Sequence, residues 1–378
     1  MILDNQRDKF KIPADIAYLN CAYMSPLMNS VVEAMQAGTR FKQQPWTYTS
    51  EDFFTYAEKG RSLFAKLIGG TADDVAIVPS ASYGIQIAAN NLILRPEGEI
   101  VLVEDQFPSH VYPWQEKAKH IGGRINIVAR PTNGDWTAAV LEAIGSQTDI
   151  VAIPATHWAD GGYFDLPVIG MAARAAGAKL VLDLTQSLGA MPFDVDAVQP
   201  DFMIAAGYKW LMGPYTLGYM YVAPRWQKGE PLEHNWMNRA GSEDFSRLVD
   251  YQDDFQKGAR RFDMGEKSNP AQLMGSAVAL QQLLDWGVEN ISETLKTRNQ
   301  DLVTRAQTLG LTMPDEHLRS PHFLGLNFPN GMPAGLPEKL TENNVFVSFR
   351  GDSMRVTQHL YNTPEDVDRL VSVLETHG

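Results

Sequence analysis

The sequence of 378 residues contains a single cysteine, Cys21. One cysteine cannot form a disulfide within the chain or build a cysteine-rich metal site. The eight histidines show no ligand-like spacing, so we expect no metal. No apolar run reaches the roughly 18 residues that span a bilayer, and the first ten residues, MILDNQRDKF, lack the apolar core of a signal peptide. The sequence therefore predicts a cytoplasmic protein without a membrane partner.

Positive charge is also scarce. Lys and Arg number 32 against 45 Asp and Glu, which gives a net charge of −13. Such a balance repels phosphate backbones, and the densest basic cluster, Lys257-Gly-Ala-Arg260-Arg261, is short. We therefore expect no nucleic-acid partner. A composition of 44% hydrophobic and 20% charged residues excludes collagenous, coiled-coil and disordered chains, and indicates a globular protein.

Short apolar runs alternate with segments of helical periodicity in the middle of the chain. The predicted strands are 75–78, 99–103, 150–154, 179–183, 201–205 and 217–222. The predicted helices between them are 83–94, 113–121, 136–144 and 166–176. Because the strands are apolar throughout rather than alternating, we expect a mainly parallel sheet covered by helices on both faces.

The composition changes after about residue 223, which indicates a second unit. Residues 224–262 are polar and predict a long excursion with little regular structure. A helical stretch over 270–309, three short strands (323–327, 345–349 and 354–357) and a final helix follow. The predicted organisation is a large α/β domain over 16–250 and a smaller α+β C-terminal domain over 251–378. For residues 1–15 we expect packing on the small domain, with the large domain as the alternative.

Two charged residues follow predicted strands of the sheet. Asp183 ends the strand 179–183, and Lys209 follows the strand 201–205 after one glycine-containing turn. Ligands of open parallel sheets bind outside the carboxyl ends of the strands, so both side chains are expected at one rim. Alone, the acid would usually be a helix cap and the lysine a solvated side chain. Together they suit pyridoxal 5′-phosphate (PLP), which a lysine holds as a Schiff base while a carboxylate pairs with the pyridinium nitrogen.

The stretch KLVLDLTQSLGAMPFDVDAVQPDFMIAAGYKWLMGPYTLGYMYV, residues 179–222, resembles the cofactor-lysine region of class V aminotransferases. Its Asp-x-x-Gln and Tyr-Lys-Trp-Leu-x-Gly-Pro elements are specific in combination. The resemblance continues from Tyr18-Leu-Asn20 to the segment Arg355–Asn362, and so covers most of the chain. It implies the PLP-dependent transferase fold of type I, with a large parallel-sheet domain and a small α+β domain. The family includes cysteine desulfurases, kynureninases, transaminases, lyases and epimerases.

The resemblance also implies roles for single residues. Lys209 would form the Schiff base and Asp183 would pair with the pyridinium nitrogen. Gln186 would lie near the ring hydroxyl or the phosphate. Ala81 and Ser82, at the start of a helix, would offer backbone amides to the phosphate, and Ser82 also its hydroxyl.

Several positions resemble the kynureninase-like branch of the family. Phe107 would lie against the cofactor ring, and Tyr208 would reach the phosphate where desulfurases tend to carry histidine. Ala206 replaces a common Ser or Thr, so one phosphate ligand is missing. Asn269, with Trp236 as a weaker candidate, would contact the phosphate of a neighbouring subunit. The resemblance therefore implies a homodimer with shared active sites.

Three further positions bear on the substrate. Arg355 would bind the substrate α-carboxylate through a bidentate guanidinium. His157 and Asp160 follow a strand and are expected to face the cofactor, but the sequence leaves their roles open.

The sequence leaves three hypotheses for the reaction. We expect an aminotransferase that exchanges an amino group between an amino acid and a keto acid. A kynureninase-like C–C hydrolase or another lyase is the alternative, although His110 and Gln186 replace the Asp and His of kynureninases. A non-catalytic scaffold is a second alternative, against which Lys209 and Asp183 argue. A persulfide-forming cysteine desulfurase is excluded on this reasoning, because no cysteine follows Cys21 to act from the small domain.

Overall fold

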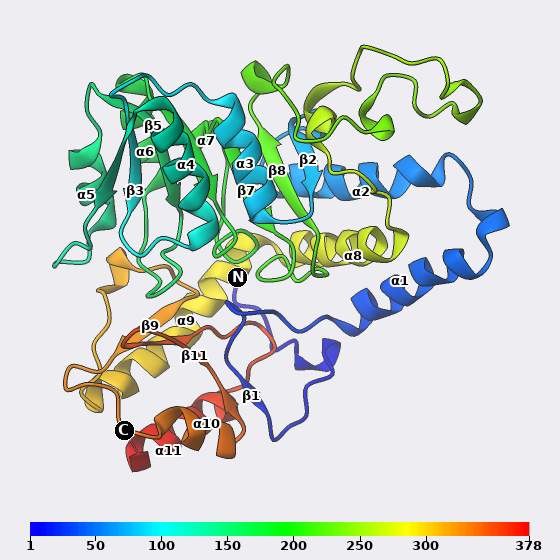
Figure 1. The fold of residues 1–378 in the computed structure, drawn as a ribbon. Coiled ribbons are helices and arrows are strands. Elements are labelled where there is room, and N and C mark those ends of the chain that lie inside the picture. Colours follow the sequence, from blue (N-terminus) through cyan, green and yellow to red (C-terminus); the bar gives the residue numbers. More distant parts are fainter. Residues whose placement is uncertain (378) are drawn as a thin grey trace.

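A seven-stranded sheet forms the centre of the larger part of the molecule (Figure 1). The computed structural model describes residues 1–377. The strand order is β2-β8-β7-β6-β5-β3-β4, and every strand except β8 points the same way. The strands are β2 (Val75–Val78), β3 (Glu99–Val103), β4 (Arg124–Val128), β5 (Thr148–Pro154), β6 (Lys179–Asp183), β7 (Phe202–Ala206) and β8 (Gly218–Val222). The carboxyl ends of six strands therefore meet at one edge.

Helices cover both faces of this sheet, as the apolar strands predict. The helices α3 (Ala81–Asn91) and α4 (Tyr112–Ile121) pack on one face and lie in front of the sheet in Figure 1. Four helices pack on the other face: α2 (Asp52–Leu67), α5 (Trp136–Ala143), α6 (Leu166–Ala175) and α8 (Pro270–Trp286). Successive strand residues alternate between the two cores, so that Phe202 and Met203 of β7 belong to opposite faces.

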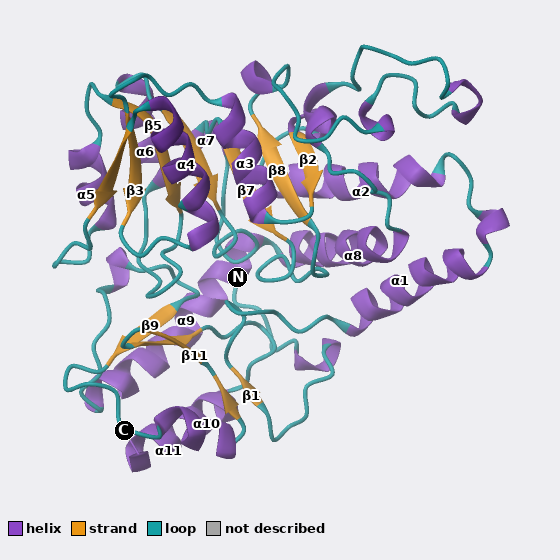
Figure 2. Cartoon of the chain, viewed as in Figure 1, coloured by secondary structure: helices purple, strands orange, loops and turns teal. Residues whose placement is uncertain are grey.

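A smaller layer lies below the large sheet in the view of Figure 2. It contains the antiparallel sheet β11 (Ser348–Arg350), β12 (Ser353–Val356) and β9 (Leu324–Asn327). Its helices are α9 (Val288–Thr308), α10 (Leu336–Glu342) and α11 (Pro364–His377). The strand β1 (Ala17–Tyr18) pairs in parallel with β10 (Val345–Phe346), so the N-terminal segment contacts this layer. Arg7 also pairs with Asp366 of α11 at 2.8 Å.

Most predicted elements are present, with ends that move by a few residues. The six predicted central strands are confirmed, but β4 was missed because this edge strand is partly exposed and mixes polar with apolar residues. The helices α1 (Asn29–Arg40) and α2 were not predicted either. Residues 224–262 contain only short 3₁₀ turns, as expected. The predicted strand 345–349 is divided into β10 and β11. The division into two domains at residue 250 stays a prediction. The helix α8 follows that boundary in the sequence but packs on α1 and α2, which precede it.

Residues 1–377 contain no helix that combines the length and apolar character of a membrane span. In the same residues, no three His, Cys, Asp or Glu side chains are grouped as metal ligands would be.

Candidate active site

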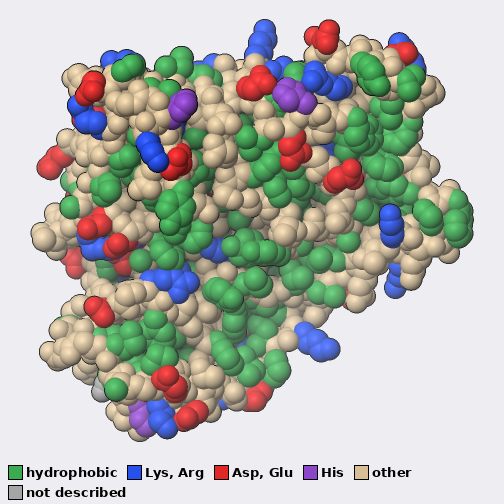
Figure 3. Space-filling view, in the orientation of Figure 1, with side chains coloured by type: hydrophobic (Ala, Val, Ile, Leu, Met, Phe, Trp, Pro, Cys, Tyr) green, Lys and Arg blue, Asp and Glu red, His purple; other side chains and the backbone are tan. Residues whose placement is uncertain are grey.

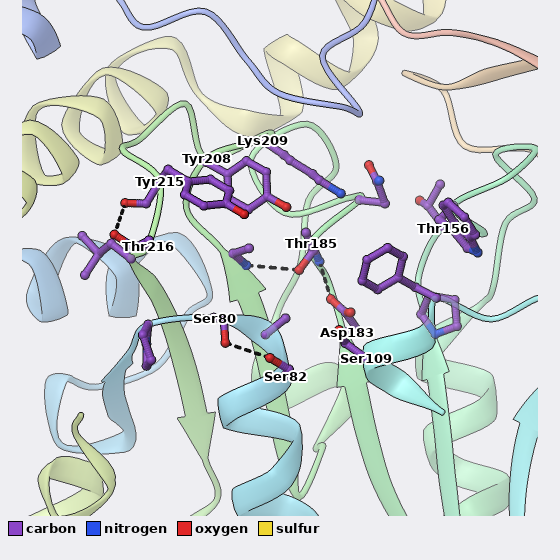
Figure 4. A pocket seen from close by; sticks show the side chains of 18 of the residues that line it. Ser80, Ser82, Ser109, Thr156, Asp183, Thr185, Tyr208, Lys209, Tyr215 and Thr216 are labelled. Carbon is purple, nitrogen blue, oxygen red and sulfur yellow. Dashed lines mark hydrogen bonds between the residues drawn. The ribbon is translucent and has the colours of Figure 1, made fainter. Parts of the chain in front are cut away.

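A cavity of about 300 Å³ lies at the carboxyl ends of the central strands. The turns after β2, β3, β5, β6 and β7 line it, because parallel strands bring their ends to one edge. Figure 4 shows Lys209 and Asp183 approaching this cavity from different elements, with Ser80 and Ser82 at a third side. Seven of the ten residues that the sequence predicts line the cavity: Ala81, Ser82, Phe107, Asp183, Gln186, Tyr208 and Lys209.

Lys209 follows β7 and is 8% exposed. Its amine lies 5.6 Å from the ring centres of both Phe107 and Tyr208, and forms no ion pair with a carboxylate of residues 1–377. Burial lowers the pKa of Lys209 to about 8, against the opposing effect of Asp183, and the charges of Arg355 and Arg350 lower it further. A large fraction of this amine is therefore neutral and nucleophilic slightly above neutral pH.

This lowered pKa predicts how the cofactor-free protein reacts with PLP. Only the neutral amine attacks a carbonyl, so the attachment rate should rise about tenfold per pH unit below pH 8 and level off above it. Stopped-flow absorbance over pH 6 to 10 measures the midpoint. Arg355→Gln removes a nearby positive charge and should move the midpoint to higher pH, whereas Arg95→Gln, on the exposed surface, should not move it. A wild-type midpoint near the ordinary lysine value of about 10.4 would contradict the prediction.

Asp183 is the last residue of β6, and its carboxylate is held at the rim of the cavity. The backbone N–H of Thr185 donates to Asp183 Oδ1 at 2.9 Å. The Thr185 hydroxyl in turn accepts from the backbone N–H of Ala206 at 3.1 Å, which ties the ends of β6 and β7 together. His110 is fully buried, and burial lowers its pKa to about 4 against the opposing effect of Asp183. The imidazole beside this carboxylate is therefore neutral at physiological pH.

The helix α3 supplies an anion-binding end to the cavity. Ser80 caps it, because its hydroxyl accepts from the backbone N–H of Tyr83 at 3.2 Å. The hydroxyls of Ser80 and Ser82 lie 2.9 Å apart. Backbone N–H groups in the first turn of a helix have no partner within the helix and lie at the positive end of its dipole. The amides of Ala81 and Ser82 therefore suit a phosphate.

Three other predicted residues complete the walls. Phe107 packs edge-on against Trp158, with ring centres 5.3 Å apart, and Tyr208 packs against Tyr215 at 4.6 Å. The amide of Gln186 is occupied by protein partners: its Nε2 donates to the Ala22 carbonyl at 3.1 Å, and its Oε1 accepts from Trp210 Nε1 at 3.0 Å. Its predicted place near the ring hydroxyl or phosphate stays a prediction.

Arg355 does not line the cavity but contacts Trp158, which does. Its Nη1 donates to the Trp158 carbonyl at 2.9 Å, and its Nε and Nη2 donate to the Ser348 hydroxyl at 2.9 and 2.6 Å. The guanidinium is nearly fully buried, and burial, with a smaller effect of Arg350, lowers its pKa to about 9.

The structure does not bring Trp236 and Asn269 into the cavity of their own chain. Asn269 is exposed and caps α8, accepting from the backbone N–H of Gln272 at 3.3 Å. Trp236 packs on Phe53 and Phe245 in the excursion. Their predicted contact with a neighbouring subunit stays a prediction.

His157 and Asp160 lie behind the cavity wall rather than in it. The His157 ring stacks on Trp136 with centres 5.0 Å apart, and its Nδ1 lies 3.2 Å from Asp160. Asp160 pairs with Arg130. The expectation that these two side chains face the cofactor was wrong, because neither lines the cavity. In the segment from His157 to Gly161, Trp158 is the residue that lines it.

Sequence reasoning missed several polar residues that line the cavity: Ser80, Ser109, Thr156, Thr185, Tyr215 and Thr216. Thr185 carried a usable signal, because it follows the strand-ending Asp183 by two residues. The others are ordinary polar residues in turns, and whether they line the cavity depends on which strands are neighbours in the sheet.

The donor set fits PLP. The helix end offers partners for its phosphate, Asp183 offers a carboxylate for its ring nitrogen, and Lys209 offers a free amine for its carbonyl carbon. The aromatic faces of Phe107 and Tyr208, which both adjoin the lysine amine, suit a flat ring.

A family model described as "Aminotransferase class-V" matches residues 17–370. The chain is similar to an uncharacterized aminotransferase, YcbU, of Bacillus subtilis, with 27% identity over 328 residues, 82% of this chain and 80% of that protein. It is also similar to the kynureninase of Deinococcus radiodurans, with 29% identity over 70% of this chain and 64% of that protein. Its fold is similar to that of the apo cysteine desulfurase of Thermococcus onnurineus NA1, with a TM-score of 0.86 and 19% identity over 100% of this chain and 99% of that one. These findings give no support to the exclusion of desulfurase activity.

Proposed function

Because the chain belongs to the class-V aminotransferase family of PLP-dependent enzymes, we propose that it transfers an amino group between an amino acid and a keto acid. The observation that carries this proposal is the juxtaposition of the unpaired Lys209 amine and the Asp183 carboxylate in one cavity. Both groups come from adjacent strand ends, and the lowered pKa of Lys209 prepares its amine to react.

Each residue then has a definite task. When bound, PLP withdraws electrons from the substrate α-carbon. Asp183 keeps a positive charge on the ring nitrogen, and the amides of Ala81 and Ser82 hold the phosphate. Phe107 lies against the ring and Arg355 holds the α-carboxylate. The Lys209 amine would hold the cofactor carbonyl carbon, and its Nζ would accept the α-proton of the substrate.

Tyr208 and Gln186 take supporting roles in this proposal. The Tyr208 hydroxyl compensates for Ala206, which cannot donate to the phosphate. Gln186 acts through its bonds to Ala22 and Trp210, which hold the N-terminal segment and the lysine-bearing turn against the cavity.

Persulfide formation is not part of the proposal, because of the place of Cys21. Its side chain is fully buried, and burial raises the pKa of the Cys21 thiol well above its ordinary value, against smaller effects of Tyr361 and Lys209. A thiol that is neutral and enclosed is a poor nucleophile.

A kynureninase-like hydrolase is the second candidate. The presence of Phe107 and Tyr208 in the cavity favours it, together with the similarity to a kynureninase. The buried, neutral His110 and the occupied amide of Gln186 differ from the Asp and His expected of that branch.

One spectroscopic experiment separates these candidates. Purified holoenzyme is mixed with a panel of amino acids and the absorbance of its cofactor is followed. Transamination predicts conversion to the pyridoxamine form and reversal by a keto acid. Release of alanine from kynurenine, with the cofactor returning to its starting form, would establish the hydrolase instead. A protein that never acquires a chromophore with PLP would be a scaffold.

We also propose that the active enzyme is a homodimer with shared sites, in which Asn269, assisted by Trp236, reaches the phosphate of the partner subunit. Figure 3 shows hydrophobic side chains gathered at the right of this face, over the excursion and the far end of α1. The excursion and the turn that follows α1 contain three large apolar residues that are highly exposed: Trp46, Val249 and Tyr251. Burying them would stabilise a dimer.

Mass measurement by light scattering should therefore give about twice the chain mass of 42.0 kDa. Tyr251→Ser should weaken the dimer, because 93% of this side chain is exposed and available for burial. Tyr112→Ser, which changes an exposed tyrosine on α4, is the matched control and should leave the mass unchanged. A monomer at micromolar concentration would contradict the proposal of shared sites.

A further inference from the structure

Two arginines share one tryptophan beside the cavity. Arg350 ends β11 and Arg355 lies in β12, and their guanidinium carbons lie 5.2 and 5.8 Å from the centre of the Trp158 ring. Trp158 itself lines the cavity that holds the Lys209 amine. Both guanidinium groups therefore lie next to a side chain of the cavity wall.

Neither arginine has an anionic partner in the part of the chain that the structure describes. Arg355 donates only to the Trp158 carbonyl and the Ser348 hydroxyl, and Arg350 donates to the Phe349 carbonyl at 2.6 Å. By contrast, Arg130, which lines the cleft beside the cavity, pairs with Asp160 and Asp105. Arg355 is buried without a counter-charge, and buried charges are normally paired. Arg350 is only half-buried, so water still reaches it, but no carboxylate of residues 1–377 occupies its guanidinium. Two neighbouring arginines without an acidic partner indicate a place for a negatively charged ligand.

Space for such a ligand is present. A cleft of about 900 Å³ adjoins the cavity and shares Gln106 and Trp158 with it, and Arg350 lines this cleft. Four acidic residues also line it: Asp105 and Asp160 pair with Arg130, and Asp315 and Asp352 form no ion pair with Arg350. A substrate held by its α-carboxylate at Arg355 can therefore extend its side chain past Trp158 toward Arg350.

We propose that Arg350 binds a second acid group at the end of the substrate side chain, so that the enzyme acts on dicarboxylic amino acids. This inference rests on the proposed function, which uses Arg355 for the α-carboxylate and leaves the second positive charge without a task. A planar guanidinium suits a carboxylate through two parallel hydrogen bonds. Phosphate and sulfonate groups share this oxyanion chemistry, and the experiment separates them.

The test compares amino acids of matched length with and without a distal acid. For the holoenzyme, kcat/KM is measured with aspartate, glutamate and 2-aminoadipate, with their neutral counterparts alanine, 2-aminobutyrate and norvaline, and with cysteate and O-phosphoserine. Arg350→Gln should lower kcat/KM about 10- to 100-fold for the preferred acidic substrate. Because the Arg350 charge also lowers the pKa of Lys209, the two proteins are compared at a pH where this amine is neutral in both. There the variant should leave kcat/KM for the neutral amino acids unchanged within about twofold. A preference for cysteate or O-phosphoserine over every dicarboxylic amino acid would overturn the assignment to a carboxylate.

Two variants serve as comparisons. Arg355→Gln should weaken the binding of all amino acids alike, because it removes the proposed partner of the α-carboxylate that they share. Arg95→Gln removes an exposed arginine that is paired with Asp149 at 2.7 Å and lines neither the cavity nor the cleft, and should leave the ratio of acidic to neutral substrates unchanged. If Arg350→Gln lowers kcat/KM equally for acidic and neutral amino acids, or if the wild type shows no preference for an acidic side chain, Arg350 does not bind the substrate side chain.

Calorimetry supplies a measurement that does not depend on turnover. Succinate and glutarate, titrated into the holoenzyme, should bind more tightly than butyrate, and Arg350→Gln should weaken them about tenfold. If this dependence holds while no amino acid alters the cofactor spectrum, the acid subsite stands and the proposed transamination fails. If amino acids react but glutarate binds no better than butyrate, the transamination stands and the subsite fails.

Discussion

Replacing Lys209 with alanine should abolish turnover and the visible absorbance of the lysine-linked cofactor, while the protein stays folded. Among residues 1–377, Lys209 supplies the one amine that lines the cavity and could attach covalently to the PLP carbonyl, and the same nitrogen is proposed to move the α-proton. Loss of both tasks should lower the turnover rate by at least about 10³-fold. The amine is buried without a counter-charge in contact, so its removal should change the free energy of unfolding by less than about 1 kcal/mol.

Absorbance spectra, steady-state rates and urea denaturation measure these three quantities. Lys179→Ala, at the opposite end of the neighbouring strand β6, is the matched control and should retain both the absorbance and the activity. Lys209→Ala protein with an unchanged cofactor spectrum would show that another amine holds PLP. Activity retained by this variant would defeat the assignment of the cavity as the active site.

Replacing Asp183 with asparagine should produce the second largest effect. The substitution keeps the shape of the side chain and can keep the hydrogen bond from the Thr185 N–H, but removes the negative charge. The positive charge on the buried ring nitrogen is then left without its partner, which costs about 3–5 kcal/mol. We expect turnover to fall about 10²- to 10³-fold and the affinity for PLP to weaken as well.

Fluorescence titration of the cofactor-free protein with PLP measures the affinity, and the amino-acid panel measures turnover. Asp165→Asn makes the same chemical change at the N-cap of α6, outside the cavity, where asparagine also caps well. It should leave both quantities unchanged. Equal values for Asp183→Asn and wild type would mean that the carboxylate does not contact the ring nitrogen.

The central strands could be predicted because strands buried on both faces are apolar without interruption. The run from Lys179 to Asp183 shows this, since four of its five residues are buried. The edge strand β4 gives no such signal, because only its last residue, Val128, is buried. The helices α1 and α2 were not predicted, although their apolar residues have helical spacing; both pack on α8, far along the chain.

The strand-end rule explains why much of the candidate site was also predictable. Asp183 ends a strand, and Lys209 and Ala81 each follow one closely, so their distance from the rim of the sheet is set by a few residues of chain. The resemblance added Phe107, Tyr208 and Gln186 by their places in motifs. What it could not supply was how their polar atoms are used, as the bonds of Gln186 to Ala22 and Trp210 illustrate.

By itself, the sequence determined the α/β class, the family and the pair formed by Lys209 and Asp183, since all three depend on local patterns and on the common direction of parallel strands. Only the tertiary structure decided that Arg350 and Arg355 lie over the ring of Trp158. That meeting depends on how the small antiparallel sheet packs against the strand ends of the large one. Contacts between residues nearly two hundred positions apart leave no periodic trace in a single chain, because packing and not local conformation selects them.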